Sequence, residues 1–519
     1  MNNPFTLEFK LRQHTPMIHF QWHEKNATIR PTELKAKLDK WIIGHQGLAE
    51  ARIDKALKDD TLRKWLRGAK KKDKSNPALN YSVKVVAVGD NILKNELDTK
   101  IEEFQRGGQT IKKIVGKEYP PYFGNQLKIQ DFKTGDERIK RLSYHKGVIV
   151  TFSSPYTDLI NKIEQQFPEF ILKTNFGTRQ GKGFGSFFIE RGTDGYPQNH
   201  EIFFNEQFDW NFDVKVQGNT DTDRISILFE KIDLFYKTLR SGISPHDRGS
   251  MYFKSLMWKY AKGQTRQWDK KTIKQTHFSR EESWQQVVHI DTDSPINWNS
   301  GLKVIMPKPT VQKPNASEEA HLIWRDILGL SSQQTWMSYN SASVNKSHLE
   351  KYSPNGLKDK IARFKSPLFF KPIRTALNTF RVFFEVPRYI KDAFRENGVR
   401  TNIEEAQILG EWFDISGSLK SLELPFPNHF NFDEFLEESF AVNPSDYVKD
   451  GEEIFTHRDG RSESIPKRHG STFSISKFNG GLGRNEWVEA HEYNPALDFL
   501  TKVFSELAKQ AKTKTSTRL

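Results

Sequence analysis

Glycines and basic side chains are interspersed between Asn175 and Gly185, a combination that suits the binding of a phosphate backbone. Glycine permits positive φ angles and a close approach of another backbone, and exposed loop amides can donate to phosphate oxygens. No Asp or Glu occurs between Ile171 and Ile189, so no acid in this stretch offsets its cations. We call Asn175 to Gly185 the glycine-rich loop. With the preceding lysine, the candidate binding residues are Lys173, Gly177, Arg179, Gly181, Lys182, Gly183, Phe184 and Gly185.

Known nucleotide-binding motifs fit the glycine-rich loop poorly. The spacing of Gly181, Gly183 and Gly185 differs from the dinucleotide fingerprint, the P-loop spacing is missing, and no clear helix follows. A glycine-rich turn that only needs unusual φ angles is the structural alternative. For Phe184, stacking on an RNA base and burial as an anchor of the loop are both open.

The composition favours a polyanionic partner. The chain has 79 Lys and Arg against 65 Asp and Glu, a formal charge of +14, which steers a protein toward phosphates. The absence of cysteine excludes disulfides, thiolate zinc sites and cysteine nucleophiles. Residues 1–12 have no apolar signal core, and no stretch approaches the roughly 20 apolar residues of a membrane span. We therefore expect a cytoplasmic protein.

The elements that must position the glycine-rich loop follow a recognisable order. Alternating apolar residues predict a strand at residues 5–11, before a turn at Thr15-Pro16, and a helix begins near Pro31. Further predicted elements are strands at 81–88 and 147–152, a helix from 154, strands at 186–190 and 201–204, and helices at 222–239 and 249–262. Consecutive strands without an intervening helix favour an α+β, ferredoxin-like (βαββαβ) domain over a parallel Rossmann sheet.

The second half of the chain predicts another domain of related design. The pattern weakens between residues 263 and 355, where only 321–328 is clearly helical, and strands return at 361–373 and 379–386. We expect domains at 1–250 and 251–519, the second with an irregular insertion near 263–355. A basic helix at 47–67, a possible second glycine loop at 470–484 and a frayed tail from Lys509 are also predicted.

Four separated segments resemble the RAMP superfamily of CRISPR-associated proteins. They are the strand ending in Thr15-Pro16, the helix start from Arg30 to Lys35, the Gly-Phe-Gly loop from Gly177 to Phe187, and residues 361–372. The last is similar to a segment of the two-domain subunit at one end of Cmr-type, type III-B complexes. The resemblance implies one or two ferredoxin-like domains in an RNA-guided effector complex, with guide RNA, target RNA and other effector subunits as partners.

The resemblance also implies an RNA site at the helix start. Arg30, Thr32 and Lys35 would present side chains and free helix amides to a phosphate. RAMP subunits that cut target RNA use an aspartate after the first strand, whereas residues 14–29 contain only Glu24 as an acid. The resemblance therefore implies a non-catalytic subunit, without metal or cofactor.

Two rival functions remain. His14, His19 and His23 suit a histidine-dependent, metal-independent nuclease that processes guide RNA, because histidine exchanges protons near neutral pH; zinc binding is a weaker option, since their spacing matches no recognised site. The second rival is a purely structural assembly subunit. Lys254 to Lys274, where cations and aromatic residues alternate, is either a further RNA surface or a solvated helix with tryptophan anchors.

Overall fold

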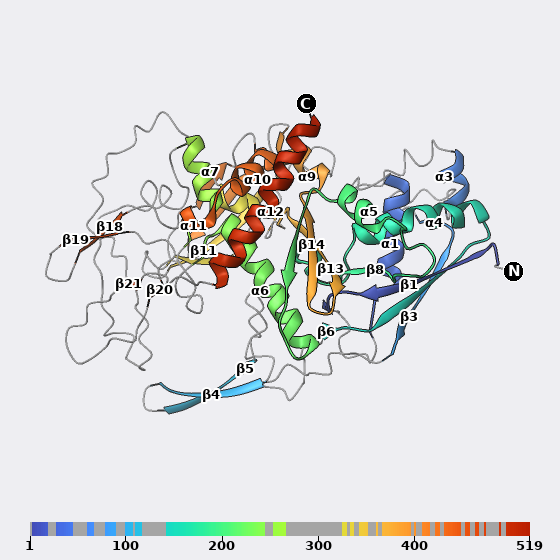
Figure 1. Ribbon diagram of the computed structural model, residues 1–519, viewed down its shortest axis with the longest axis horizontal. Coiled ribbons are helices and arrows are strands. Elements are labelled where there is room, and N and C mark those ends of the chain that lie inside the picture. Colours follow the sequence, from blue (N-terminus) through green and yellow to red (C-terminus); the bar gives the residue numbers. More distant parts are fainter. Residues whose placement is uncertain are drawn as a thin grey trace. The chain divides into compact units, whose positions relative to one another are not determined.

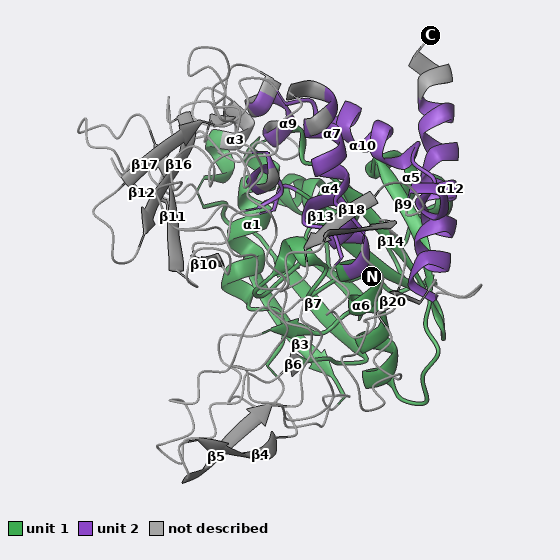
Figure 2. Ribbon diagram, turned by 90° about the vertical axis from the view of Figure 1, so that its left-hand side faces the viewer, with its two compact units in different colours: residues 1–233, 368–389 green, residues 234–367, 390–519 purple. Residues whose placement is uncertain are grey.

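The computed structural model divides the chain into two compact units, coloured separately in Figure 2. Unit 1 comprises Met1–Asp233 and Leu368–Tyr389, and unit 2 comprises Leu234–Pro367 and Ile390–Leu519. The structure describes residues 3–18, 27–44, 60–66, 78–89, 99–106, 109–116, 142–243, 253–265, 324–329, 333–336, 342–350, 360–361, 366–395, 399–400, 407–415, 421–425, 430–447, 452–456, 462–466, 472–473, 487–488 and 495–518.

The first sheet of unit 1 has four antiparallel strands in the order β3-β7-β1-β8 (Figure 1). These are β1 (Thr6–Gln13), β3 (Ser82–Val88), β7 (Gly147–Ser153) and β8 (Phe187–Ile189). All four were predicted as strands, the first from alternating apolar residues, and the structure confirms them. The short strands β2 (Met17–Ile18) and β6 (Leu142–Ser143) pair beside this sheet, and β4 (Thr99–Arg106) pairs with β5 (Gln109–Gly116).

Two helices cover one face of this sheet, and both predicted helix starts are confirmed. They are α1 (Pro31–Gly44), in which proline occupies the favoured first position, and α4 (Thr157–Leu172). Phe9 of β1 stacks on Phe167 of α4 with ring centroids 4.4 Å apart. Burial of each such side chain contributes about 1.5–3 kcal/mol, so the apolar stripes of these elements fix the helices on the sheet.

A second sheet of unit 1 joins segments that are far apart in the sequence. It contains β9 (Trp210–Lys215), β13 (Phe369–Ala376) and β14 (Thr379–Glu385) in the antiparallel order β13-β14-β9. Helix α6 (Asp221–Arg240) follows β9 along the chain. The hairpin of β13 and β14 was predicted as strands, and it belongs to unit 1 although more than 150 residues separate it from β9.

The prediction of a strand at residues 201–204 is wrong, because this segment lies in helix α5 (His200–Gln207). Within it Ile202 is 59% exposed while Phe204 is buried, so the two apolar residues do not share a strand face. Periodicity over four residues cannot distinguish a short strand from a single helical turn.

Unit 2 contains a helical core. Phe235 of α6 contacts Phe440 of α10 (Phe432–Phe440) and Phe504 of α12 (Pro495–Arg518) with ring centroids 6.3 and 6.0 Å apart. Its other elements are α7 (Leu256–Thr265), η4 (Arg325–Leu328), β10 (Gln333–Trp336), β11 (Ala342–Glu350), β12 (Lys360–Ile361), α9 (Arg388–Arg395), β15 (Val399–Arg400), β16 (Gln407–Ile415), β17 (Ser421–Pro425), α11 (Pro444–Tyr447), β18 (Glu452–Thr456), β19 (Ser462–Pro466), β20 (Thr472–Phe473) and β21 (Trp487–Val488).

Several predictions for the second half are corrected. The tail is helical to Arg518 rather than frayed from Lys509, because α12 continues from a stretch anchored by buried Phe504 and Leu507. The region 263–355 contains β10 and β11, so it is not irregular throughout. The predicted helix at 249–262 is α7, shifted toward the C-terminus, whose Tyr260 is buried.

Other predicted features lie wholly or partly outside the described residues. They are the possible glycine loop at 470–484, of which only 472–473 are described, most of the basic helix at 47–67, of which α3 (Asp60–Trp65) is described, and the rest of the basic stretch beyond Thr265. None of the helices in the described ranges is both long enough and apolar enough to cross a bilayer.

Candidate nucleic-acid interface

The glycine-rich loop connects α4 to β8 and contains one short helix, η3 (Gln180–Lys182). Gly177 and Gly185 have φ angles of 81° and 66°, and Arg179 has a φ of 59°. A Cβ on Gly185 would lie 2.0 Å from the Phe176 carbonyl oxygen, which no side chain tolerates. These glycines are therefore required by the close approach of the chain to itself.

The Thr15-Pro16 turn holds the loop from the side of β1. The hydroxyl of Thr15 donates to the Gly183 carbonyl at 2.6 Å and accepts from the Ser186 amide at 2.9 Å. The Gly185 amide donates to the Pro16 carbonyl at 2.8 Å. Two segments that are some 170 residues apart thus form one hydrogen-bonded layer.

Helix α1 contacts the loop from a second side through hydrogen bonds made by an ion pair within the helix. Glu33 Oε1 accepts from the Gly177 amide at 3.2 Å and from Gln180 Nε2 at 3.0 Å, and lies 2.9 Å from Lys37 Nζ. Lys37 also donates to the Asn175 carbonyl at 2.8 Å. The loop is free of acids in sequence, yet the fold brings a carboxylate onto its backbone.

Strand β13 supports the loop from beneath with a buried lysine. Lys371 is fully buried, and its ammonium donates to the carbonyls of Ile171, Thr174 and Phe187 at 2.7, 2.7 and 2.8 Å. Burial, followed by the charge of Lys37, shifts the pKa of Lys371 well below its usual value. Sequence reasoning missed this residue; the available signal was a single lysine within the apolar strand Leu368–Ile373.

Of the two interpretations of Phe184, the structure favours burial as an anchor of the loop over stacking on a base. This side chain is fully buried, and its ring stacks on that of Phe229 in α6 with centroids 3.9 Å apart. Phe184 is the buried anchor of the loop, because its ring has no exposed surface to offer to a base.

Lys173 and Lys35 are engaged within the protein. Lys173 lies 2.5 Å from Glu385 and 4.5 Å from the centre of the Phe208 ring. Lys35 pairs with Asp39 at 3.1 Å and donates to the Leu79 carbonyl at 2.7 Å. Asp39 is buried, and desolvation raises its pKa despite that pairing. Both lysines therefore have structural roles.

The remaining predicted residues lie closer to solvent. Arg179, Gly181 and Lys182 are half-buried at the apex of the loop, and Arg30 and Thr32 are exposed at the start of α1. We call Arg179, Gly181 and Lys182 the outer rim, and Thr15, Glu33, Gly177, Gly185 and Lys371 the inner scaffold. Contacts of Glu33 with Gly177 and Gln180 bring the first turn of α1 against the loop.

His14 is buried beneath this site. Its Nδ1 accepts from the Arg374 amide at 3.0 Å. Burial lowers the pKa of His14 well below 6.5, and Arg12, Lys371 and Arg374 lower it further. His14 is therefore neutral at pH 7, whereas His19 and His23 lie outside the described residues. Within the described ranges, no group of three or more His, Asp or Glu is arranged to hold a metal ion.

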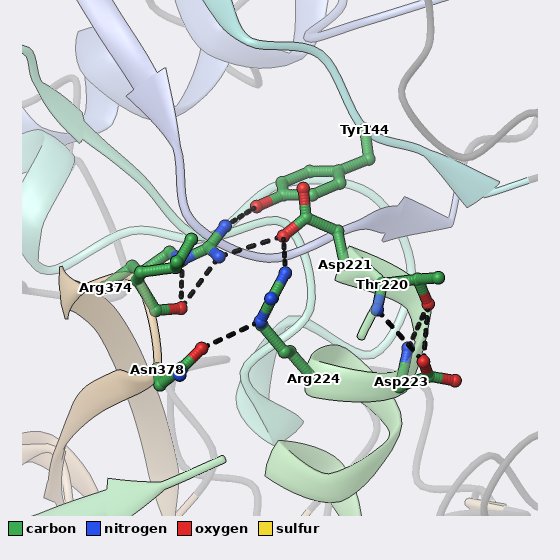
Figure 3. Close-up of polar contacts among 8 residues, drawn as sticks. Tyr144, Thr220, Asp221, Asp223, Arg224, Arg374 and Asn378 are labelled. Carbon is green, nitrogen blue, oxygen red and sulfur yellow. Dashed lines mark hydrogen bonds and ion pairs between the residues drawn. The ribbon is translucent and has the colours of Figure 1, made fainter. Parts of the chain in front are cut away.

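A polar cluster fixes the β13–β14 hairpin to the start of α6 (Figure 3). Arg374 lies 2.9 Å from Asp221 and donates to the Tyr144 hydroxyl at 3.4 Å. Arg224 contacts the same Asp221 carboxylate at 3.4 Å and donates to the Asn378 side chain at 2.9 Å. This network, also missed from sequence, immobilises the hairpin that carries Lys371.

Two family models match the chain. The Cmr1 N-terminal domain matches residues 4–243 and the Cmr1 C-terminal domain matches residues 252–456. No curated protein and no solved structure matches it. The matches confirm the resemblance to the two-domain RAMP subunit, and they identify a subunit of type III-B CRISPR effector complexes from a family that is generally not catalytic. The chain belongs to the Cmr1 family.

Proposed function

We propose that this chain is a non-catalytic, cytoplasmic RNA-binding subunit of its effector complex, contacting guide or target RNA in antiviral defence. The outer rim carries the proposal: Arg179 and Lys182 lie half-buried at the apex of a loop that contains no acid. The inner scaffold fixes that apex before any ligand arrives, which lowers the entropic cost of binding. Arg30 and Thr32, exposed at the adjacent start of α1, extend the same proposed surface.

We also propose that the protein contains two ferredoxin-like domains. The element order β1-α1-β3-β7-α4-β8 and the sheet order β3-β7-β1-β8 support the first, because its first and third strands are central neighbours. The order β9-α6-β13-β14 with sheet order β13-β14-β9 supports the second by repeating the first three strand positions. A domain boundary near residue 250 is supported by the two family models, because the first ends at residue 243 and the second begins at residue 252. Strand β9 precedes this boundary in the sequence but would belong to the second ferredoxin-like domain.

A binding role is favoured over histidine catalysis. His14 is buried and neutral, and its Nδ1 already accepts a backbone hydrogen bond, so it has no exposed nitrogen for proton transfer to RNA. General acid–base catalysis requires the group to reach the reacting proton.

The salt dependence of RNA binding tests the proposal. We expect the double variant Arg179→Ala/Lys182→Ala to bind single-stranded RNA about tenfold more weakly. Its slope of log affinity against log salt should fall by about 1.4, since two phosphate contacts are lost. The matched control is Arg191→Ala/Lys215→Ala, which removes two exposed cations outside the loop. An unchanged slope, or an equal loss in the control, would contradict the proposed interface.

A further inference from the structure

The strand register determines which side chains lie on the face of the first sheet opposite α1 and α4. Residues directly opposed in antiparallel strands point to the same side of the sheet. Across β1, β7 and β3, the rows on this face are Thr6–Ser153–Ser82, Glu8–Thr151–Lys84, Lys10–Ile149–Val86 and Arg12–Gly147–Val88. The alternate residues Phe9, Leu11, Val148 and Val150 are buried in the core on the helix side.

The exposed large apolar side chains on this face lie on its edge strand, β3. Val86 and Val88 are 44% and 41% exposed, and both belong to β3. Among the described strands β3 pairs only with β7, and it forms the outer edge of the sheet (Figure 1). We call Lys84, Val86 and Val88 the valine edge. An edge with exposed valines and unpaired backbone groups is a template for another strand.

The charge around the valine edge is predominantly positive. Lys10, Arg12 and Lys84 point to the same face as the two valines, and Glu8 is the acid in these rows. Within the described residues, no ion pair neutralises any of these three cations. A partner that covers this face gains from carrying acidic side chains.

We propose that the valine edge binds an extended acidic segment of another protein, which adds a strand beside β3. Strand addition supplies backbone hydrogen bonds, while the two valines and the cations select alternate side chains of the segment. Protein is favoured over RNA because no exposed aromatic ring lies in these rows. Phe188, which continues the Arg12 row in β8, is only 1% exposed, whereas sheets that bind RNA stack bases on exposed aromatic side chains. The inference rests on the proposed function in that the partner is expected within the effector complex.

A single introduced thiol tests the proposal, since the chain contains no cysteine. Val86→Cys would be labelled with a benzophenone maleimide, assembled with the other effector subunits and guide RNA, and irradiated. We expect mass spectrometry to find Val86→Cys linked to a protein segment rich in Asp and Glu. Ile202→Cys, at a position 59% exposed on α5, is the matched control and should not reach that segment.

Three outcomes would overturn the inference. They are a crosslink from position 86 to RNA, crosslinks from positions 86 and 202 to the same target, and no protein crosslink from position 86 in an assembled complex. A second experiment measures how efficiently variants of the chain are incorporated into the effector complex. Val86→Glu/Val88→Glu should enter the complex about tenfold less efficiently than Ile202→Glu at equal melting temperature, because like charges repel the acidic segment. Equal incorporation would also overturn it. RNA binding by the free chain is measured separately, so its failure would count against the proposed function alone.

Discussion

Within the glycine-rich loop, residues of the inner scaffold and of the outer rim are neighbours in sequence but have opposite environments. Gly185 and Phe184 are buried against the chain itself, whereas Arg179 and Lys182 are half-buried at the apex. The residues that most resembled a ligand site, the glycines and the phenylalanine, mainly build the loop. The difference teaches that substitutions in the scaffold should act first on stability, and substitutions in the rim first on RNA affinity.

Lys371→Met should give the largest loss of stability. It leaves the carbonyls of Ile171, Thr174 and Phe187 without their buried donor. We expect the free energy of unfolding to fall by about 4 kcal/mol, as for other buried polar groups that lose their partner. Urea denaturation measures this, with Lys215→Met, an exposed lysine of β9, as control. A loss below about 1 kcal/mol would show that the ammonium does not hold the loop.

Gly185→Ala should give the second-largest loss of stability. The new methyl group would lie 2.0 Å from the Phe176 oxygen at a φ of 66°. We expect a loss of about 3 kcal/mol from strain and crowding together. Gly192→Ala is a matched control, because its φ is 83° but nothing lies within 4 Å of the new carbon. It should cost only about 1 kcal/mol. Equal losses would mean that backbone strain alone sets the requirement for glycine.

The stability of the inner layer should also depend on His14. Its folded pKa lies well below the unfolded value of 6.5. The contribution is therefore complete above pH 6.5 and is lost as the pH falls toward the folded pKa. The loss at pH 5 should be at most about 2 kcal/mol. His14→Asn keeps an acceptor for the Arg374 amide but does not titrate, so it should remove this pH dependence. An identical pH profile for both proteins would contradict a neutral buried histidine.

Among the scaffold substitutions, Glu33→Gln should have the smallest effect, because it removes a charge but keeps a hydrogen-bond acceptor. The amide retains an acceptor for Gly177 but loses the ion pair with Lys37. For this half-buried pair we expect a stability loss of about 0.5–1 kcal/mol. Faster hydrogen exchange should be confined to residues 175–182, where it would show that Glu33 orders the apex. Exchange that rises equally across β1 and β7 would indicate general destabilisation instead.

The sequence predicted the framework of the fold but not its long-range contacts. Strand signals in the sequence predicted β1, β3, β7 and β8, and in β1 and β7 buried and more exposed residues alternate. The same reasoning failed at residues 201–204, where four residues are too few to establish a period. Nothing local indicates that residues 368–389 return to pair with β9, since strand partners are set by the whole topology.

The sequence predicted where the candidate site lies in the chain, but not the role of each of its residues. The glycines of residues 175–185 located the loop, since positive φ leaves a signature in the sequence. Glu33 and Lys371 reach the loop from α1 and β13, so their roles depend on tertiary contacts. Lys173 and Lys35 look like surface cations in sequence, and their carboxylate partners Glu385 and Asp39 are seen only in the structure.

Photocrosslinking of the assembled complex tests the central claim most directly. RNA carrying 4-thiouridine would be irradiated with the wild-type protein, and the crosslinked residues mapped by mass spectrometry. If the outer rim is the RNA interface, crosslinks will fall on Arg179 to Lys182 and not on buried Phe184 or ion-paired Lys173. Crosslinks elsewhere on the chain with none on Arg179 to Lys182 would contradict it.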